Sequence, residues 1–262
     1  DIEEGFNQSV FLNLANSAEQ IFTEAELEHV AALTKKYQRN RSDLSPAVIQ
    51  KEIERLTIEL AWKSSKIEGN TYSLLDTETL LKTGLANPAH SHENAQMLLN
   101  HKTALNYIIE QPDLYRELSL KNLTELHSLL VDKLVIDQQI RSRLVSITGT
   151  RYRPLDNEFQ IREALENTCL LINQSSEPIV KALYASALLS YIQAFADGNK
   201  RTSRIACNAI LMAHDHCPLS YRSIDITEYK KAVLLFYEQN NIKYLKELLL
   251  EQYEFAVNNY FC

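Results

Sequence analysis

A turn between two helical segments, Asp197-Gly198-Asn199, constrains the fold of this chain most strongly. Residues 178–192 before it are rich in isoleucine, leucine, valine and alanine, so we expect a buried helix there. The next helix begins near Lys200. Because glycine permits a positive φ and asparagine tolerates it better than most residues, three residues are enough to turn the chain. We therefore expect two helices joined tightly in the core.

Glycine and proline are scarce, with five glycines and six prolines in 262 residues. Sheets and long loops use more of both, so we predict an all-α fold, a helical bundle. Residues 143–154 are the exception, since Val145, Ile147 and Tyr152 around a Thr-Gly-Thr sequence predict a short β-hairpin. Residues 1–22 are expected to be irregular, and 38–46 to form a polar connection. Helices are predicted at 23–37, 47–67, 74–83, 91–110, 119–134, 158–174, 178–192, 200–214, 226–239 and 241–258.

Charge and cysteine content argue against several classes of protein. The net charge of −7 disfavours a general nucleic-acid partner, which normally meets a basic face. The four cysteines show no CxxC spacing, which indicates reduced thiols rather than a disulfide framework or a zinc site. No apolar run approaches the roughly 20 residues that span a bilayer, and the first residues do not resemble a signal peptide. We expect a cytoplasmic protein with no membrane partner.

The turn has the chemistry of a phosphate site. Backbone N–H groups of such a turn point into one concavity, and the start of a helix favours negative charge. Arg201 and Arg204 are three residues apart and share a helix face, where each planar guanidinium could bond two phosphate oxygens. Asp197 would repel a phosphate by itself. A Mg²⁺ ion bridging it to the phosphates resolves the conflict, because Mg²⁺ commonly takes one carboxylate plus phosphate oxygens.

The same residues also fit an ordinary turn and a solvated arginine face, but the longer sequence favours the phosphate site. Residues 193–204 read Gln-Ala-Phe-Ala-Asp-Gly-Asn-Lys-Arg-Thr-Ser-Arg. This resembles the Fic-family pattern His-x-Phe-x-Asp/Glu-Gly-Asn-Gly/Lys-Arg-x-x-Arg at every fixed position except the first. Leu144–Pro154 resembles the hairpin "flap" of Fic proteins. Ser64–Gly69 resembles their inhibitory motif, Ser/Thr-x-x-x-Glu-Gly/Asn.

The resemblance implies a Fic fold, with residues 1–90 as an N-terminal helical region carrying Ser64–Glu68 and residues 91–262 as the Fic core. It implies ATP and Mg²⁺ as cofactors. It also implies transfer of AMP to hydroxyl side chains of a target protein that docks at the flap, Leu144–Pro154. Lysine at position 200 is shared with the Doc branch, which transfers phosphate, whereas Arg204 is typical of AMP-transferring members. Whether the chain forms a homodimer is left open.

Carried over by position, the resemblance assigns binding roles to the motif residues. Phe195 fixes the loop, Asp197 holds Mg²⁺, the backbone of Gly198, Asn199 and Lys200 cradles the α- and β-phosphates, Arg201 steadies the β-phosphate and Arg204 binds the γ-phosphate. The next helix, 226–239, carries Tyr229 and Tyr237, which we interpret as core residues rather than contacts of the adenine base.

Glu68 lies in the last turn of the predicted helix 47–67, which Gly69 ends. A carboxylate there faces the negative end of the helix dipole, at a cost of roughly 0.3–1 kcal/mol if unpaired. Ser64 is one turn earlier on the same face. The resemblance names Arg204 as the partner of Glu68, in a contact that blocks productive placement of the γ-phosphate. We therefore expect an autoinhibited member of the family.

Gln193 stands at the position of the family's catalytic histidine. A histidine accepts a proton near neutral pH and a glutamine amide does not. General-base help is worth about 10²–10⁴-fold, so we expect weak or absent transfer. His214 and His216 lie at the far end of the predicted helix 200–214, roughly 20 Å from the turn, too far away to replace the base. We interpret the other histidines as surface or capping residues: His29, His90, His92, His101 and His127.

Three interpretations of Gln193 stay open. The chain is a natural member that binds nucleotide without transferring it, it uses another phosphate-bearing donor or an acceptor that needs no base, or a histidine was replaced. The function classes that follow are an adenylyltransferase of low activity and a non-catalytic, nucleotide-binding regulator of a partner. Detectable turnover separates them.

Overall fold

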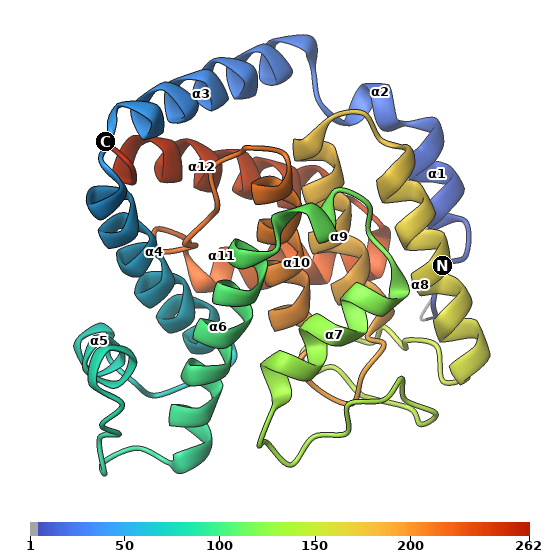
Figure 1. Cartoon of the computed structure of the whole chain (residues 1–262). Helices are drawn as coiled ribbons and strands as arrows, with labels where there is room; N and C mark the ends of the chain where they lie inside the picture. Colours follow the sequence, from blue (N-terminus) through green and yellow to red (C-terminus); the bar gives the residue numbers. More distant parts are fainter. Residues whose placement is uncertain (1–4) are drawn as a thin grey trace.

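The computed structural model describes residues 5–262, which fold into helices joined mostly by short connections, with one long connection, residues 132–157, between α7 and α8 (Figure 1). The helices are α1 (Val10–Asn16), α2 (Ala18–Ile21), α3 (Glu24–Asp43), α4 (Pro46–Ile67), α5 (Leu74–Thr83), α6 (His92–Glu110), the 3₁₀ helix η1 (Pro112–Tyr115), α7 (Leu120–Val131), α8 (Glu158–Gln174), α9 (Pro178–Ile192), α10 (Asn199–Ala213), α11 (Ile226–Gln239) and α12 (Lys243–Asn259). The predicted all-α bundle is confirmed, and every predicted helix is present. Within the described part of the chain, every helix is too short or too polar to cross a membrane.

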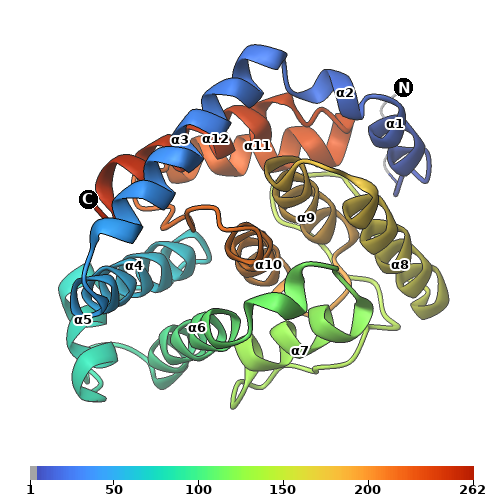
Figure 2. The same ribbon diagram turned by 45° about the horizontal axis from the view of Figure 1, so that its top comes forward.

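Helix α10 lies at the centre of the molecule. Figure 2 shows it ringed by α4, α6, α7 and α9, with α11 and α12 beyond. All of its residues except Lys200 and Met212 are buried. Arg201 and Arg204 belong to this central helix, so their charges need partners inside the protein.

Two predicted irregular segments are partly helical, and both predictions are wrong there. Residues 1–4 lie outside the described residues, but α1 and α2 occupy most of the rest of 1–22. Helix α1 buries Val10 and Leu14, one turn apart, and the Leu14 carbonyl accepts from the Tyr184 hydroxyl at 3.0 Å. Tertiary packing therefore stabilises a helix that is too short to stand out in the sequence. Helix α3 continues to Asp43, because arginine is a good helix former and Arg41 lies in the last turn, where a cation suits the helix dipole.

The predicted β-hairpin at 143–154 is also wrong. Within residues 5–262 the only β-bridge joins Gly5 and Arg153, and residues 143–154 form a loop with a turn at Thr148-Gly149. Side chains hold this loop against the helices instead of against itself. Thr150 Oγ1 donates to Glu238 at 2.6 Å, and the Tyr152 hydroxyl donates to the Tyr191 carbonyl at 2.8 Å. These anchors replace the strand ladder, and the loop still faces the site described next.

Candidate functional site

The turn between α9 and α10 depends on two left-handed residues. Gln193 ends α9 with φ 52°, and Gly198 precedes α10 with φ 84°. A Cβ atom on Gly198 would lie 3.1 Å from Val131 Cγ1 and 3.3 Å from His127 Nε2. A side chain here would be both strained and crowded, so the turn requires glycine.

The loop between these two residues is braced from inside. The Asn199 side chain bonds both backbone groups of Phe195, accepting from its N–H at 2.9 Å and donating to its carbonyl at 2.8 Å. The Phe195 ring stacks on the His127 imidazole with centroids 3.6 Å apart and planes 7° from parallel. His127 Nε2 donates to the Asp197 carbonyl at 2.9 Å. The loop is thus fixed by contacts that need no ligand.

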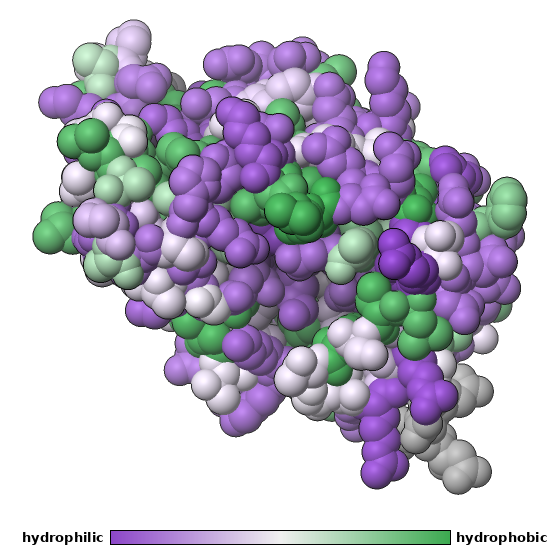
Figure 3. Space-filling model, turned by 90° about the horizontal axis from the view of Figure 1, so that it is seen from below, coloured by the Kyte–Doolittle hydropathy of each residue, from purple (hydrophilic) through white to green (hydrophobic). Residues whose placement is uncertain are grey.

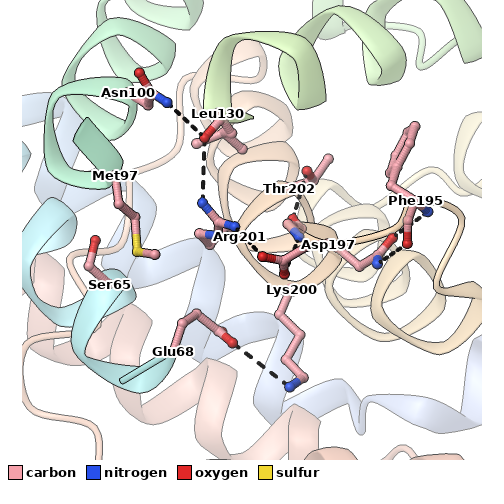
Figure 4. A network of polar contacts seen from close by, with 12 residues as sticks. Ser65, Glu68, Met97, Asn100, Leu130, Phe195, Asp197, Lys200, Arg201 and Thr202 are labelled. Atoms are coloured by element: carbon pink, nitrogen blue, oxygen red, sulfur yellow. Dashed lines mark hydrogen bonds and ion pairs between the residues drawn. The ribbon is translucent and has the colours of Figure 1, made fainter. Parts of the chain in front are cut away.

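The N-terminus of α10 leaves backbone donors unused. No side chain caps it, and the N–H groups of Asn199, Lys200 and Arg201 donate to nothing within residues 5–262. Arg201 is 1% exposed, and its Nη2 donates to Asp197 Oδ2 at 3.1 Å (Figure 4). Its Nη1 reaches the Leu130 carbonyl only at 3.5 Å. Free N–H groups beside an incompletely paired guanidinium are suited to an anion.

Arg204 is 0% exposed and bonds the end of α4. Its Nε donates to Ser64 Oγ at 2.9 Å, and its Nη2 donates to the Ser64 carbonyl at 3.0 Å and to Glu68 Oε1 at 2.7 Å. Its Nη1 lies 3.3 Å from the Tyr229 hydroxyl. The structure therefore brings together Ser64, Glu68 and Arg204 in one contact, which we call the clamp. The alternative of a solvated arginine face is wrong.

The backbone around Glu68 holds its side chain in place. Glu68 is the C-cap of α4, and Gly69 follows with φ 95°. The Gly69 N–H donates to the Lys66 carbonyl and the Asn70 N–H to the Ser65 carbonyl, both at 3.0 Å. This is a Schellman ending, and it confirms that Gly69 terminates the helix.

The Glu68 carboxylate is charged and shared between two cations. Its Oε1 meets Arg204, and its Oε2 lies 3.8 Å from Lys200 Nζ (Figure 4). Burial opposes ionisation, but Arg204 and Lys200 outweigh it, and the pKa of Glu68 lies below its ordinary value. One carboxylate therefore pairs with two cations that could otherwise meet phosphates, closely with Arg204 and more distantly with Lys200.

The Gln193 amide is fully engaged. Its Nε2 donates to the Ser190 carbonyl at 2.6 Å and lies 3.2 Å from the Tyr237 hydroxyl, and its Oε1 accepts from Asn199 at 3.2 Å. Burial raises the pKa of Tyr237 above its ordinary value, so this phenol does not supply a base near neutral pH. Gln193 braces the loop, and neither it nor Tyr237 can accept a proton at the position where a base is expected.

A cavity of about 590 Å³ opens beside these groups. It is lined by residues 67–69, 145–149 and 196–201, by Gln193 and by residues 229, 230, 233 and 234 of α11. Figure 3 views this end of the molecule, where the surface is mostly hydrophilic with smaller hydrophobic patches. The volume is in the range of small-molecule sites, and the lining combines a cationic turn with the apolar side chains Ile67, Val145 and Val233. An anionic ligand with an apolar portion fits such a cavity.

Asp197 is the carboxylate that could meet a metal. Within residues 5–262, no cluster of three or more His, Cys, Asp or Glu side chains could hold a metal ion by itself. The Asp197 side chain is 66% exposed at the cavity, and among the described residues its two oxygens accept from Gly198 N–H and from Arg201 alone. One exposed carboxylate fits Mg²⁺ that arrives with phosphates, because this ion takes few protein ligands.

The interpretation of the histidines is wrong for two of them. His101 and His127 are both 0% exposed, and burial lowers the pKa of His101 to about 3 and that of His127 to about 4. His127 supports the turn, and His101 Nε2 lies 2.8 Å from Ser64 Oγ. One signal could have revealed His101. It lies three residues after Leu98 and four before Leu105, on the apolar stripe of α6.

Comparison with known proteins supports the resemblance to Fic proteins. Residues 117–211 match the model of the Fic/DOC family, and this range ends within α10, so it includes the whole turn and both arginines. The chain contains a Fic domain. Ser64 and Glu68 lie outside the matched residues, on α4.

Curated relatives and solved structures agree with a Fic domain. The chain is 27% identical over 162 residues to protein adenylyltransferase fic-1 of Caenorhabditis elegans, a match that covers 58% of this chain and 31% of the relative. It is 25% identical over 217 residues to protein adenylyltransferase Fic of Drosophila persimilis, covering 81% and 42%. The chain thus spans less than half of the length of these relatives.

The fold of the solved structures extends over most of the chain. Fic-1 of Caenorhabditis elegans superposes with a TM-score of 0.73 at 21% identity, covering 95% of this chain and 72% of that one. A Fic-domain-containing signaling protein of Bacteroides thetaiotaomicron superposes with a TM-score of 0.71 at 20% identity, covering 89% and 96%. The all-α architecture is therefore the Fic fold.

Proposed function

We propose that the chain is an ATP-binding protein of the Fic adenylyltransferase type, which transfers AMP to target-protein hydroxyls weakly or not at all. One observation carries the proposal: Arg204 bonds Glu68 at 2.7 Å beside a cavity lined by the free N–H groups of the phosphate turn. The similarity to two adenylyltransferases supports ATP as the nucleotide.

The clamp acts as an inhibitor in this proposal. A phosphate placed near the start of α10 would meet a carboxylate where it needs a cation, because Glu68 occupies both Arg204 and Lys200. Removal of Glu68 frees the two cations for the phosphates. Asp197, 66% exposed at the same cavity, would hold Mg²⁺ together with the phosphates. That ion supplies charge neutralisation when bound.

The residues of the turn would bind and orient the nucleotide without performing proton transfer. The N–H groups of Asn199, Lys200 and Arg201 cradle phosphates, and Arg201 adds a buried charge to the cradle. A target hydroxyl that reaches the cavity past residues 145–149 finds the Gln193 amide where a base is needed. Its proton therefore has no acceptor there, and turnover is low.

A second candidate is a nucleotide-binding regulator without transfer activity. The contacts of Gln193 favour it, because its amide bonds Ser190 and Asn199 and so supports the turn. In that case nucleotide occupancy alone would act on a partner docked along residues 144–154.

The test compares ATP binding and AMP transfer in three proteins that all carry Glu68→Gly, so that the clamp is released: the chain otherwise unchanged, Gln193→His and Gln193→Asn. Binding is measured by calorimetry, and transfer by incorporation of label from the α-phosphate of ATP into protein. We expect ATP to bind all three and label to appear above background only with Gln193→His, by a factor of about 10²–10⁴.

The asparagine variant is the matched control, because it keeps an amide and changes only its reach. Labelling by Gln193→Asn at the level of Gln193→His would refute the missing-base explanation. ATP binding by all three proteins with no transfer by the histidine variant would support the regulator. Absence of ATP binding by all three would refute both.

A further inference from the structure

A buried imidazole lies directly behind the clamp. His101, on α6, is 0% exposed and contacts Ser64 of α4 across the interface between the two helices. It lies neither in the matched motif nor against the cavity. It is a polar side chain on the apolar stripe of α6.

The directions of the hydrogen bonds around His101 are fixed by its partners. Its Nδ1 lies 2.9 Å from the Met97 carbonyl, which can only accept, so Nδ1 carries the proton. The Nε2 of a neutral imidazole is then an acceptor, and it lies 2.8 Å from Ser64 Oγ. The Ser64 hydroxyl must therefore donate to His101. Burial lowers the pKa of His101 to about 3, with Arg201 and Arg204 acting in the same direction, so the ring is neutral.

The next bond in the series reaches Arg204. The Ser64 hydroxyl gives its only proton to His101, which leaves its lone pairs facing the Arg204 Nε–H at 2.9 Å. Arg204 Nη2 in turn meets the Ser64 carbonyl and Glu68. The series Met97–His101–Ser64–Arg204–Glu68 has one consistent proton arrangement, and each donor has an acceptor.

We propose that His101 is a positioning residue of the clamp. By accepting the Ser64 proton, it aims the Ser64 lone pairs at Arg204 and holds the guanidinium in the orientation that Glu68 binds. The inhibition rests on the proposed function, whereas the hydrogen-bond series does not. Without an acceptor at His101, the Ser64 hydroxyl turns away, Arg204 loses one of its anchors, and Glu68 competes less well with a phosphate.

The test uses His101→Leu, which removes the acceptor, and His101→Gln, whose amide oxygen can replace Nε2. Each substitution is made both in the chain that keeps Glu68 and in the Glu68→Gly variant, and the ATP affinity of all these proteins is measured by calorimetry. We expect His101→Leu to tighten ATP binding by roughly two- to tenfold, the range of one hydrogen bond, only when Glu68 is present. His101→Gln restores the affinity of the unchanged chain.

Ser64→Ala tests the same series from its other end and changes the core less. Ser64→Ala should tighten ATP binding as much as His101→Leu does. The double variant should have the same ATP affinity as either single variant, because the two residues act through one bond. Equal effects of His101→Leu with and without Glu68 would overturn the proposal. So would a His101→Gln variant that behaves like His101→Leu.

A nucleotide-free measurement separates this inference from the proposed function. The Arg204 Nε–H, followed by ¹⁵N-resolved hydrogen exchange, should be protected in the unchanged chain and in His101→Gln. It should lose protection in His101→Leu and in Ser64→Ala. That pattern together with no ATP binding in any variant would refute the proposed function and leave the positioning role standing. Unchanged protection in both His101→Leu and Ser64→Ala would overturn the positioning role itself.

Discussion

Glu68 and Arg204 are 136 residues apart in the chain, and their side chains meet at 2.7 Å. The glutamate stands on a Schellman turn at the end of α4, and the arginine stands on the central helix α10. Because Arg204 is 0% exposed and Glu68 is 21% exposed, the carboxylate is the part of the pair that the cavity reaches. A ligand therefore competes for the arginine from the side of the glutamate.

Asp197→Asn should remove the Mg²⁺ dependence of ATP binding. The amide keeps the size of the side chain but loses the charge that a divalent ion needs. In the unchanged chain, chelation of Mg²⁺ by EDTA should weaken ATP binding at least several-fold, whereas in Asp197→Asn it should have little effect. Calorimetric titration with and without EDTA checks this. An equal Mg²⁺ effect in both proteins would show that Asp197 does not hold the ion.

Gly198→Ala should destabilise the fold more than Gly84→Ala does. Both glycines have a left-handed backbone, with φ of 84° and 76°, which costs an alanine about 1–2 kcal/mol. Only at position 198 would the new Cβ also crowd Val131 and His127, while nothing lies within 4 Å at position 84. Urea unfolding measures both variants, and Gly84→Ala serves as the matched control for backbone strain.

The crowding at position 198 has a second consequence. Gly198→Ala should also weaken ATP binding, because the N–H groups of the turn must shift, whereas Gly84→Ala should leave it unchanged. Equal losses of stability in the two variants would mean that the turn relaxes freely, which would contradict a rigid, braced loop.

His101 should make the fold sensitive to acid. Its pKa is about 3 in the folded chain and about 6.5 in an unfolded one, so between these values the unfolded chain binds more protons. The free energy of unfolding therefore falls as the pH drops below about 6.5. This one residue should contribute on the order of 1 kcal/mol per pH unit.

Comparison with His101→Gln isolates that contribution from the other histidines. Urea unfolding at pH values from 7.5 to 5 gives the free energy of unfolding of both proteins. Its dependence on pH should be the same for the two above pH 7, and below about 6.5 it should fall more steeply for the unchanged chain. Curves that stay parallel to pH 5 would show that His101 takes up its proton without unfolding.

Much of the fold could be predicted from the sequence, because its helices are long and marked by clear ends. Helix α4 (Pro46–Ile67) was predicted to within one residue, at 47–67, and Gly69 was identified as the residue that terminates it. The short helix α1 and the loop at 143–154 could not be predicted. They depend on contacts with Tyr184, Tyr191 and Glu238, which lie far away in the chain.

The residues of the candidate site, too, could be predicted only in part from the sequence. The motif residues 197–204 were identified by their resemblance to the Fic-family pattern, and the structure places Asp197, Gly198, Asn199, Lys200 and Arg201 at one cavity. The supporting residues His101 and His127 were missed, because the residue type does not reveal burial and the position of His101 on the apolar stripe of α6 was not used as a signal. Only the folded chain shows that α6 and α7 bring them behind Ser64 and beneath Asp197.

Calorimetric titration of ATP into the unchanged chain and into Glu68→Gly, in the presence of Mg²⁺, tests the central claim most directly. Glu68 is a C-cap residue rather than part of the helix interior, so glycine is tolerated there, and Glu68→Gln provides a second variant that removes only the charge. The account predicts that both variants bind ATP at least tenfold more tightly than the unchanged chain, because Arg204 and Lys200 become free for the phosphates. Equal or weaker ATP binding in both variants would contradict it.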